Sequence, residues 1–303
     1  GTTSVEKSDE VTVSDAELAG NPFRQDWETP YGVPPFSDIE NSDYLPAIKK
    51  AILEMRDEIQ TIVSNSEEPT FANTIVALEL AGQSLNKVSR TFGNITGTDT
   101  DEELRSLETE IYPMLTREYD AISLNEVLYD RVKKVYDSRE SLGLNEQDSR
   151  LLELTHRSFI RSGAAFSPDV KSKIASINEE ISGLTTKFAQ NLLLETKAFR
   201  LELKSDEEVS GLSEDFKSAI WDEEKEAWVV GLNRSSYESF MVQSNNRSLR
   251  EKLFNGYRLR ATQGDRDNGP IAIQIAKLRA ERAELMGYES HAHYVLELSL
   301  IHI

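Results

Sequence analysis

Cysteine is absent from the 303 residues, so the chain has no disulfide, thiolate metal ligand or cysteine nucleophile. Histidine is scarce, with only four residues: His156, His291, His293 and His302. No run of about 18 apolar residues occurs, so no membrane-spanning segment is predicted. Basic residues are also few, because 34 Lys and Arg face 53 Asp and Glu, giving a net charge of −19. An acidic surface repels phosphate, which argues against binding to nucleic acid or to an anionic membrane.

The familiar catalytic motifs are missing as well. The sequence contains no phosphate-binding G-x-x-x-x-G-K-[ST], no G-x-S-x-G and no H-E-x-x-H. His291 and His293 are two residues apart in a helical pattern and would point about 200° apart, so they are not expected to share a metal. His156 is predicted to be a surface or core-edge residue of a helix. The carboxylate runs are typical of a solvated face. We therefore predict no catalytic, cofactor-binding or metal-binding residue in this chain.

The first 42 residues are predicted to differ from the rest. Residues 1–20 are polar and acidic without sustained periodicity, which predicts a disordered leader. Residue 1 is Gly rather than Met, so the chain begins after a removed signal peptide or at an arbitrary cut. The first alternative implies a periplasmic or cell-envelope protein, and the second leaves a cytoplasmic one open. Residues 21–42 hold four of the nine prolines with several aromatic residues, and are expected to form an extended arm packed onto the body.

From residue 43 onward, apolar residues recur with helical spacing, which predicts an array of amphipathic helices. The first is predicted to end at Val63 and has Pro46 in its first turn, where proline is tolerated. A second helix is expected from an N-cap at Thr70 to the glycine-rich stretch 93–100.

A third helix is expected from a capping box that begins at Thr100, and Pro113 predicts a kink or break within it. The remaining helices are predicted at about 125–141, from Asn145 to near Gly163, and at 168–196, 235–244, 246–262 and 269–287.

The longest predicted helix, 168–196, carries six large apolar residues on one stripe and is expected to be the central buried spine: Ile174, Ile177, Ile181, Leu184, Phe188 and Leu192. The period then changes, because 199–205 and 226–233 read as strands around a short helix at 212–224. The predicted fold class is therefore mainly α, a multi-helix array with a small two-stranded β insertion at about 199–233.

Long ordered strings carry a resemblance to a known family. These are PPFSDIENSDYLPAIKKAI (34–52), EPTFANTIVALELAGQSLNKVSRTFGNITGTDT (68–100), LNEVLYDRVKKVYDSRESLGLNEQDSRLLELTHRSFIRSGAAF (124–166), INEEISGLTTKFAQNLLLET (177–196), NNRSLREKLFNGYRLRATQGDRDN (245–268) and AKLRAERAELMGYESHAHYVLE (276–297). Over about residues 30–297 the chain resembles the N-terminal half of the thimet oligopeptidase, oligopeptidase A and dipeptidyl carboxypeptidase family of zinc metallopeptidases. Among these it is most similar to the bacterial peptidyl-dipeptidases.

The resemblance implies that residues 43–297 form the helical N-terminal lobe of a two-lobed channel peptidase that admits short peptides. It also implies a zinc site, with H-E-x-x-H and a downstream Glu, in a second half that this chain does not contain. No catalytic or metal residue can therefore be carried over, and we expect no zinc on this chain.

The last six residues, LSLIHI (298–303), depart from the family pattern. They match the translation of a transposon mosaic end used in preparing sequencing libraries. We therefore expect 298–303 to be a non-native tail, in which His302 has no role. The alternative is a genuine apolar C-terminus.

The leading hypothesis is an N-terminal fragment of a zinc-dependent peptidyl-dipeptidase that releases C-terminal dipeptides from short peptides and is inactive as this chain alone. One alternative is an endo-acting oligopeptidase of the same family. Another is a stand-alone, non-catalytic helical binding module. No peptide preference and no oligomeric state follow from the sequence.

Overall fold

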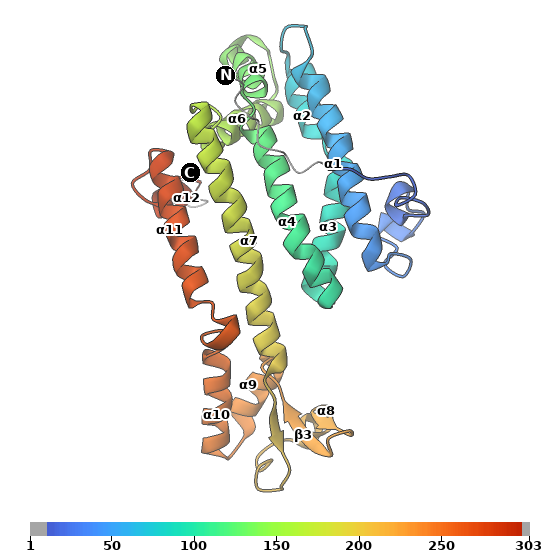
Figure 1. The fold of residues 1–303 in the computed structure, drawn as a ribbon, viewed down its shortest axis with the longest axis vertical. Coiled ribbons are helices and arrows are strands. Elements are labelled where there is room, and N and C mark those ends of the chain that lie inside the picture. Colours follow the sequence, from blue (N-terminus) through green and yellow to red (C-terminus); the bar gives the residue numbers. More distant parts are fainter. Residues whose placement is uncertain (1–10, 299–303) are drawn as a thin grey trace, which may run out of the picture. The chain divides into compact units, whose positions relative to one another are not determined.

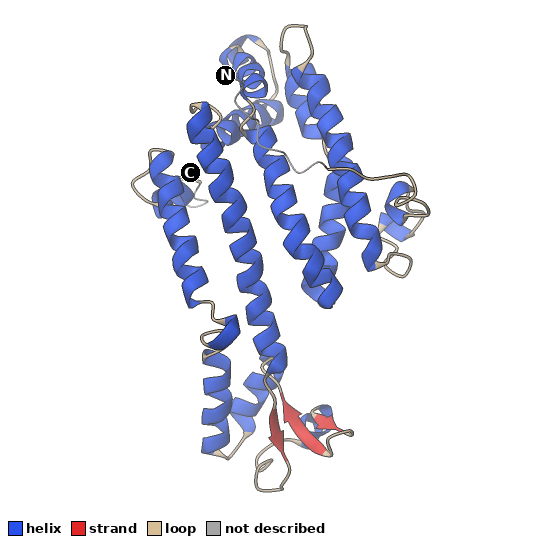
Figure 2. Ribbon diagram, viewed as in Figure 1, coloured by secondary structure: helices blue, strands red, loops and turns tan. Residues whose placement is uncertain are grey.

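The structure is a computed structural model that describes residues 11–298 (Figure 1). The chain forms two compact units. The first holds the chain up to Gly183 and again from Glu281, and the second holds 184–280. Helices dominate both units, and the fold is mainly α, as the sequence predicts (Figure 2). None of the helices in the described residues is long and apolar enough to cross a membrane.

Two helices have residues in both units: α7 (Pro168–Ala198) and α11 (Gly269–Leu285). The other helices of the first unit lie within it. The others, in chain order, are α1 (Asn41–Val63), α2 (Ala77–Leu80), α3 (Gln83–Thr98), α4 (Glu102–Ser123), α5 (Glu126–Asp137), α6 (Glu146–Ser162) and α12 (His291–Leu296).

The core of the first unit lies where α1 packs against α3 and α4. One apolar face of α1 is buried there, with Ile48 and Ile52 fully inaccessible to solvent. The Tyr44 and Phe92 rings are also buried, with centroids 5.2 Å apart. Burial of such side chains contributes roughly 1.5–3 kcal/mol each relative to leaving them exposed. This cluster therefore supplies much of the driving force that holds the first unit together.

The N-terminal segment is more ordered over its described part than the expected leader. Residues 15–20 form turns, and Val11 and Leu18 are buried. The rest of the expected leader, 1–10, lies outside the described residues.

The proline-rich arm packs only part of its aromatic residues. Phe23 is buried against Tyr44, with ring centroids 5.5 Å apart, and Trp27 packs on Phe23 and donates a hydrogen bond to the Pro22 carbonyl. Tyr31 and Phe36 are exposed, so the expected packing holds at the start of the arm and not at its tip.

The predicted second helix is interrupted. Thr70 caps it as expected, but the first turns are a π-helix, Phe71–Val76, followed by the short α2. Gly82 then breaks the chain with φ +75°, and α3 continues past the expected end to Thr98. A left-handed residue cannot continue a helix, whereas the glycines of 93–100 have ordinary helical backbone and are tolerated.

The third helix also differs from the prediction at two points. Asp101, not Thr100, is the N-cap, because its carboxylate accepts a hydrogen bond from the Leu104 amide at 2.8 Å. Pro113 does not break α4, which runs on to Ser123. Proline removes one helical hydrogen bond, and the burial of Ile111 and Met114 beside it holds the helix together.

The α7 helix has the predicted extent but is not a fully buried spine. Of the six predicted residues, only Ile174 and Ile177 are buried. The other four are partly exposed: Ile181, Leu184, Phe188 and Leu192. The spine prediction is therefore wrong for the last four residues of the stripe. The described residues shield these four side chains from solvent only in part.

The second unit contains the β insertion. Its elements after α7 are β1 (Leu201–Leu203), α8 (Glu214–Ala219), β2 (Trp221–Asp222), β3 (Ala227–Val230), α9 (Arg234–Gln243) and α10 (Arg247–Arg258). The antiparallel sheet has three strands in the order β1-β3-β2, not the predicted two. The missed β2 is two residues long, too short to show alternation, and pairs Trp221 with Trp228. Phe240 and Leu253 are buried in the same hydrophobic core as the residues of this sheet.

Candidate functional site

The three histidines within the described residues do not form a group that could hold a metal ion. His156 lies on α6 and stacks on Tyr136, with ring centroids 3.9 Å apart, and burial lowers its pKa. His291 and His293 open the short helix α12. The His293 imidazole lies 2.8 Å from the Ser290 hydroxyl and 3.5 Å from a Glu289 carboxylate oxygen. His302 lies outside the described residues.

No part of the described chain, residues 11–298, groups three His, Asp or Glu side chains in a way that could hold a metal ion. The carboxylate runs at 67–68, 101–103 and 222–226 are almost entirely exposed, as expected for a solvated face. A catalytic zinc needs three protein ligands and an open position. The residues present therefore do not fit zinc, and no catalytic step can be assigned to them.

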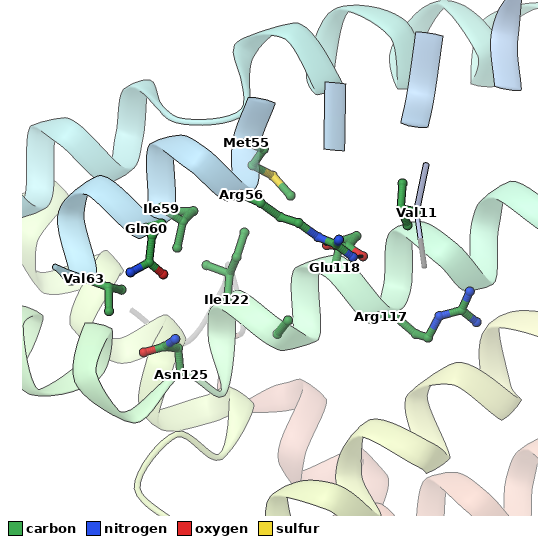
Figure 3. A pocket seen from close by; sticks show the side chains of 11 residues that line it. Val11, Met55, Arg56, Ile59, Gln60, Val63, Arg117, Glu118, Ile122 and Asn125 are labelled. Carbon is green, nitrogen blue, oxygen red and sulfur yellow. Dashed lines mark hydrogen bonds and ion pairs between the residues drawn. The ribbon is translucent and has the colours of Figure 1, made fainter. Parts of the chain in front are cut away.

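A cavity of about 390 Å³ opens between α1 and α4 (Figure 3). Its apolar wall comes from Met55, Ile59 and Val63 of α1 and from Ile122 of α4. The N-terminal segment reaches this cavity through Val11, which is buried there as part of the core. The cavity is therefore lined in part by the first described residue of the chain.

The charged groups of this cavity are paired within the protein. Arg56 reaches from α1 to Glu118 on α4 and donates two hydrogen bonds to its carboxylate, at 2.8 and 2.5 Å (Figure 3). Glu118 is only 6% exposed. Arg117 points away to Glu179 on α7, at 2.5 Å. These charges are therefore paired within the protein, and the cavity lining mixes apolar side chains with the amide groups of Gln60 and Asn125, which lie toward one side of it (Figure 3).

A polar cluster links three helices in the first unit. Asn178 of α7 donates from its amide nitrogen to both carboxylate oxygens of Asp120 on α4, at 3.0 Å each. Arg282 of α11 donates to the Asn178 amide oxygen at 2.6 Å. The Arg117–Glu179 ion pair lies beside this cluster and also joins α4 to α7. These contacts connect α7 to α4, and α11 to α7, within the first unit.

Asp120 is the titratable group of this cluster whose pKa lies far from its ordinary value. Burial, with a smaller contribution from the negative charge of Glu179, raises the pKa of Asp120 to about 6. The Asn178 hydrogen bonds and the positive charge of Arg282 act in the opposite direction without offsetting burial. The sequence reasoning missed this cluster, because its members are 58 and 104 residues apart and form no local motif.

Comparison with known proteins finds relatives whose similarity extends over nearly the whole chain. A dipeptidyl carboxypeptidase of Escherichia coli K12 is 32% identical over 278 residues, which is 90% of this chain and 41% of that protein. The organellar oligopeptidase A of Arabidopsis thaliana is 28% identical over 302 residues, 96% of this chain and 38% of that protein. The chain is a homologue of dipeptidyl carboxypeptidases and oligopeptidases A. No family model matches it.

Other relatives extend the same group. Oligopeptidase A of Salmonella typhimurium is 25% identical over 274 residues, covering 88% of this chain and 40% of that protein. The chain thus spans about two fifths of the length of these curated relatives. The resemblance to this group of peptidases that the sequence strings indicate is confirmed.

Proposed function

We propose that the chain is the N-terminal part of a zinc-dependent oligopeptidase, a peptidyl-dipeptidase that releases C-terminal dipeptides from short peptides. The observation that carries the proposal is the similarity over 90% of this chain to a dipeptidyl carboxypeptidase of which it spans only 41%. The mainly helical fold agrees with the lobe that the resemblance implies.

The zinc belongs, in this proposal, to the part of the enzyme that the chain does not span. This placement is supported by the lack of a fitting ligand group within residues 11–298. The 303-residue chain is then expected to hydrolyse no peptide and to bind no stoichiometric zinc. Its role would be to shape the space that admits short peptides and excludes folded proteins.

Two other functions remain alternatives. The first is an endo-acting oligopeptidase of the same group, and relatives named oligopeptidase A, such as the Salmonella protein, are compatible with it. A stand-alone helical binding module is the non-catalytic alternative. For the compartment, a periplasmic or envelope location would follow from a removed signal peptide, and a cytoplasmic location is the alternative. Nucleic acid is not expected as a partner, because the net charge is −19.

The test uses the protein encoded by the complete reading frame, with the 303-residue chain as its control. Its substrates are a short peptide with a free C-terminus and the same peptide with a C-terminal amide. A peptidyl-dipeptidase releases a dipeptide from the first and leaves the second intact. An endo-acting enzyme cleaves both internally. Failure to cleave either peptide in the presence of zinc would favour the binding module.

A further inference from the structure

The segment that follows α11 lies against helix α6 of the first unit. We call residues 288–297, which include the short helix α12, the strap. Helix α6 and the strap both belong to the first unit, which takes up the chain again at Glu281. Arg161, in the last turn of α6, contacts Glu297 although the two residues are 136 positions apart in the sequence. Tertiary contacts therefore join two distant segments of the same unit.

Helix α12 is too short to be stable alone. It has six residues, whereas isolated helices shorter than about 12–15 residues are marginal in water. Burial of apolar side chains contributes little, because all residues of α12 are at least partly exposed, and Val295 and Leu296 are 50% and 63% exposed. The strap must therefore owe its folded position to specific contacts with the rest of the first unit.

The Arg161 guanidinium supplies such contacts. The residue is only 7% exposed. Its guanidinium forms an ion pair with the Glu297 carboxylate and donates to the Tyr294 carbonyl oxygen at 2.7 Å. It also lies over the Tyr294 ring, 4.3 Å from the ring centroid. Within residues 11–298, every hydrogen bond that this guanidinium donates goes to the strap. A buried guanidinium needs such partners, because a buried charge without them is costly.

Two tyrosines of the strap complete the arrangement. The Tyr288 hydroxyl donates to the Glu297 carboxylate at 2.5 Å, so this carboxylate has both a guanidinium and a hydroxyl as partners. The Tyr294 hydroxyl donates to the Arg161 carbonyl oxygen at 3.3 Å. The rings of Tyr288 and Tyr294 pack edge to face, with centroids 5.2 Å apart. Because these contacts share members, the loss of the guanidinium weakens several of them together.

We propose that the strap opens and closes as a local unit and that Arg161 is the residue that fastens it to α6. Elements that bury little apolar surface open at a lower free energy than the core of the same protein. In the open state, water solvates the Arg161 guanidinium and the Glu297 carboxylate separately, and α12 loses the contacts that keep it helical. The core around α1, where Ile48 and Ile52 are fully buried, stays folded when the strap opens.

Amide hydrogen exchange of the 303-residue chain, resolved by NMR, tests this proposal. The amides of Tyr294 and Glu297 are hydrogen-bonded in the closed strap and report its opening, whereas the α1 amides report unfolding of the core. In Arg161→Gln, the strap amides should exchange about 10- to 100-fold faster, the factor for losing hydrogen bonds to a charged group. Exchange in α1 should stay unchanged. Glu297→Gln keeps the Tyr294 contacts and should give a smaller increase.

Arg157→Gln is the matched control. It removes an arginine one turn earlier on α6, whose pair with Glu153 is partly exposed on both sides, and should leave strap exchange within about threefold of the parent. Strap amides that exchange in the parent like those of an unfolded peptide, or as slowly as those of α1, would overturn the local unit. Unchanged strap exchange in Arg161→Gln, or equal acceleration in the strap and in α1, would overturn the fastening role of Arg161.

Discussion

Buried charged side chains in the first unit are compensated by specific partners. Arg131, 7% exposed, donates to the carbonyls of Asn65 and Glu67 and thereby fixes the loop after α1. Arg161, also 7% exposed, forms an ion pair with Glu297 and donates to the Tyr294 carbonyl at 2.7 Å. Leaving a buried charge without such a partner costs several kcal/mol. These residues therefore connect segments that are far apart in the sequence.

The Arg56–Glu118 pair gives the first prediction at this scale. Arg56→Ala should destabilise the first unit by about 2 kcal/mol, since it leaves the buried Glu118 carboxylate uncompensated while partial exposure of Arg56 admits some water. Arg150→Ala is the matched control, because the Arg150–Glu153 pair is exposed on both sides and should cost less than about 0.5 kcal/mol. Urea unfolding measures both, and equal costs would contradict the account.

Asp120 gives a pH-dependent prediction. Its folded-state pKa, about 6, lies above the value of an unfolded Asp, so its contribution to stability is fully present below about pH 4 and is lost as the pH rises through 6. Relative to Asp120→Asn, the parent should therefore gain stability on acidification from pH 7.5 to pH 5. With part of the group exposed to water, we expect about 1 kcal/mol. The free energy of unfolding of both proteins at both pH values checks this, and a parent that loses stability relative to the variant would refute it.

At the scale of elements, the helix ends follow local chemistry closely. Asn145 caps α6 by accepting from the Asp148 amide at 2.8 Å, and Gly163 ends that helix with φ +96°, both as predicted. The break at Gly82 was not predicted, although glycine there has a physical reason. Its amide donates to the Glu58 carboxylate at 2.7 Å, and its φ is +75°.

The break gives a prediction with an internal control. Gly82→Ala should destabilise the first unit by about 1–2 kcal/mol, because an L residue is strained at this φ and its β carbon would lie 3.1 Å from the Met55 sulfur. Gly93→Ala in the neighbouring helix α3 has helical backbone and no close neighbour, so it should stabilise by about 0.5–1 kcal/mol. Thermal melts of the two variants should shift in opposite directions. Melting temperatures that shift in the same direction would contradict the role assigned to the backbone conformation of Gly82.

Phe92 and Phe188 allow the cost of truncating a fully buried side chain to be compared with that of truncating a partly buried one. Phe92 is fully buried on α3, so Phe92→Ala should cost about 3–5 kcal/mol and leave the first unit largely unfolded. Phe188 on α7 is only partly buried, so Phe188→Ala should cost distinctly less. Circular dichroism and chemical denaturation of the two variants decide this. An equal loss of unfolding free energy in the two variants would support the original prediction that α7 is a buried spine.

At the scale of the whole molecule, the sequence predicts most helices and their class but not the contacts between distant elements. Local signals such as the Asn145 cap, the Pro46 position and the alternation in 199–205 suffice for secondary structure. The Asp120–Asn178–Arg282 cluster depends on three helices meeting, which no spacing reveals. The burial of α7 cannot be predicted from the sequence either. Its stripe is equally apolar whether or not another element packs against it.

Several apolar side chains stay exposed on the second unit and on α12. Val242, Leu259 and Ile273 are 84%, 54% and 59% exposed, and Leu296 on α12 is 63% exposed. Scattered exposed apolar residues are common in monomeric proteins. In a larger enzyme they would be available to pack against the part that this chain does not span, which agrees with the proposed function.

The proposed peptidase is tested most directly by the genomic DNA that follows the codon for residue 297. The account predicts an open reading frame that continues without LSLIHI and encodes H-E-x-x-H with a further Glu downstream, the ligand set for one zinc ion. A native stop codon directly after residue 303, with no such motif in frame, would contradict it and leave the helical binding module as the better description.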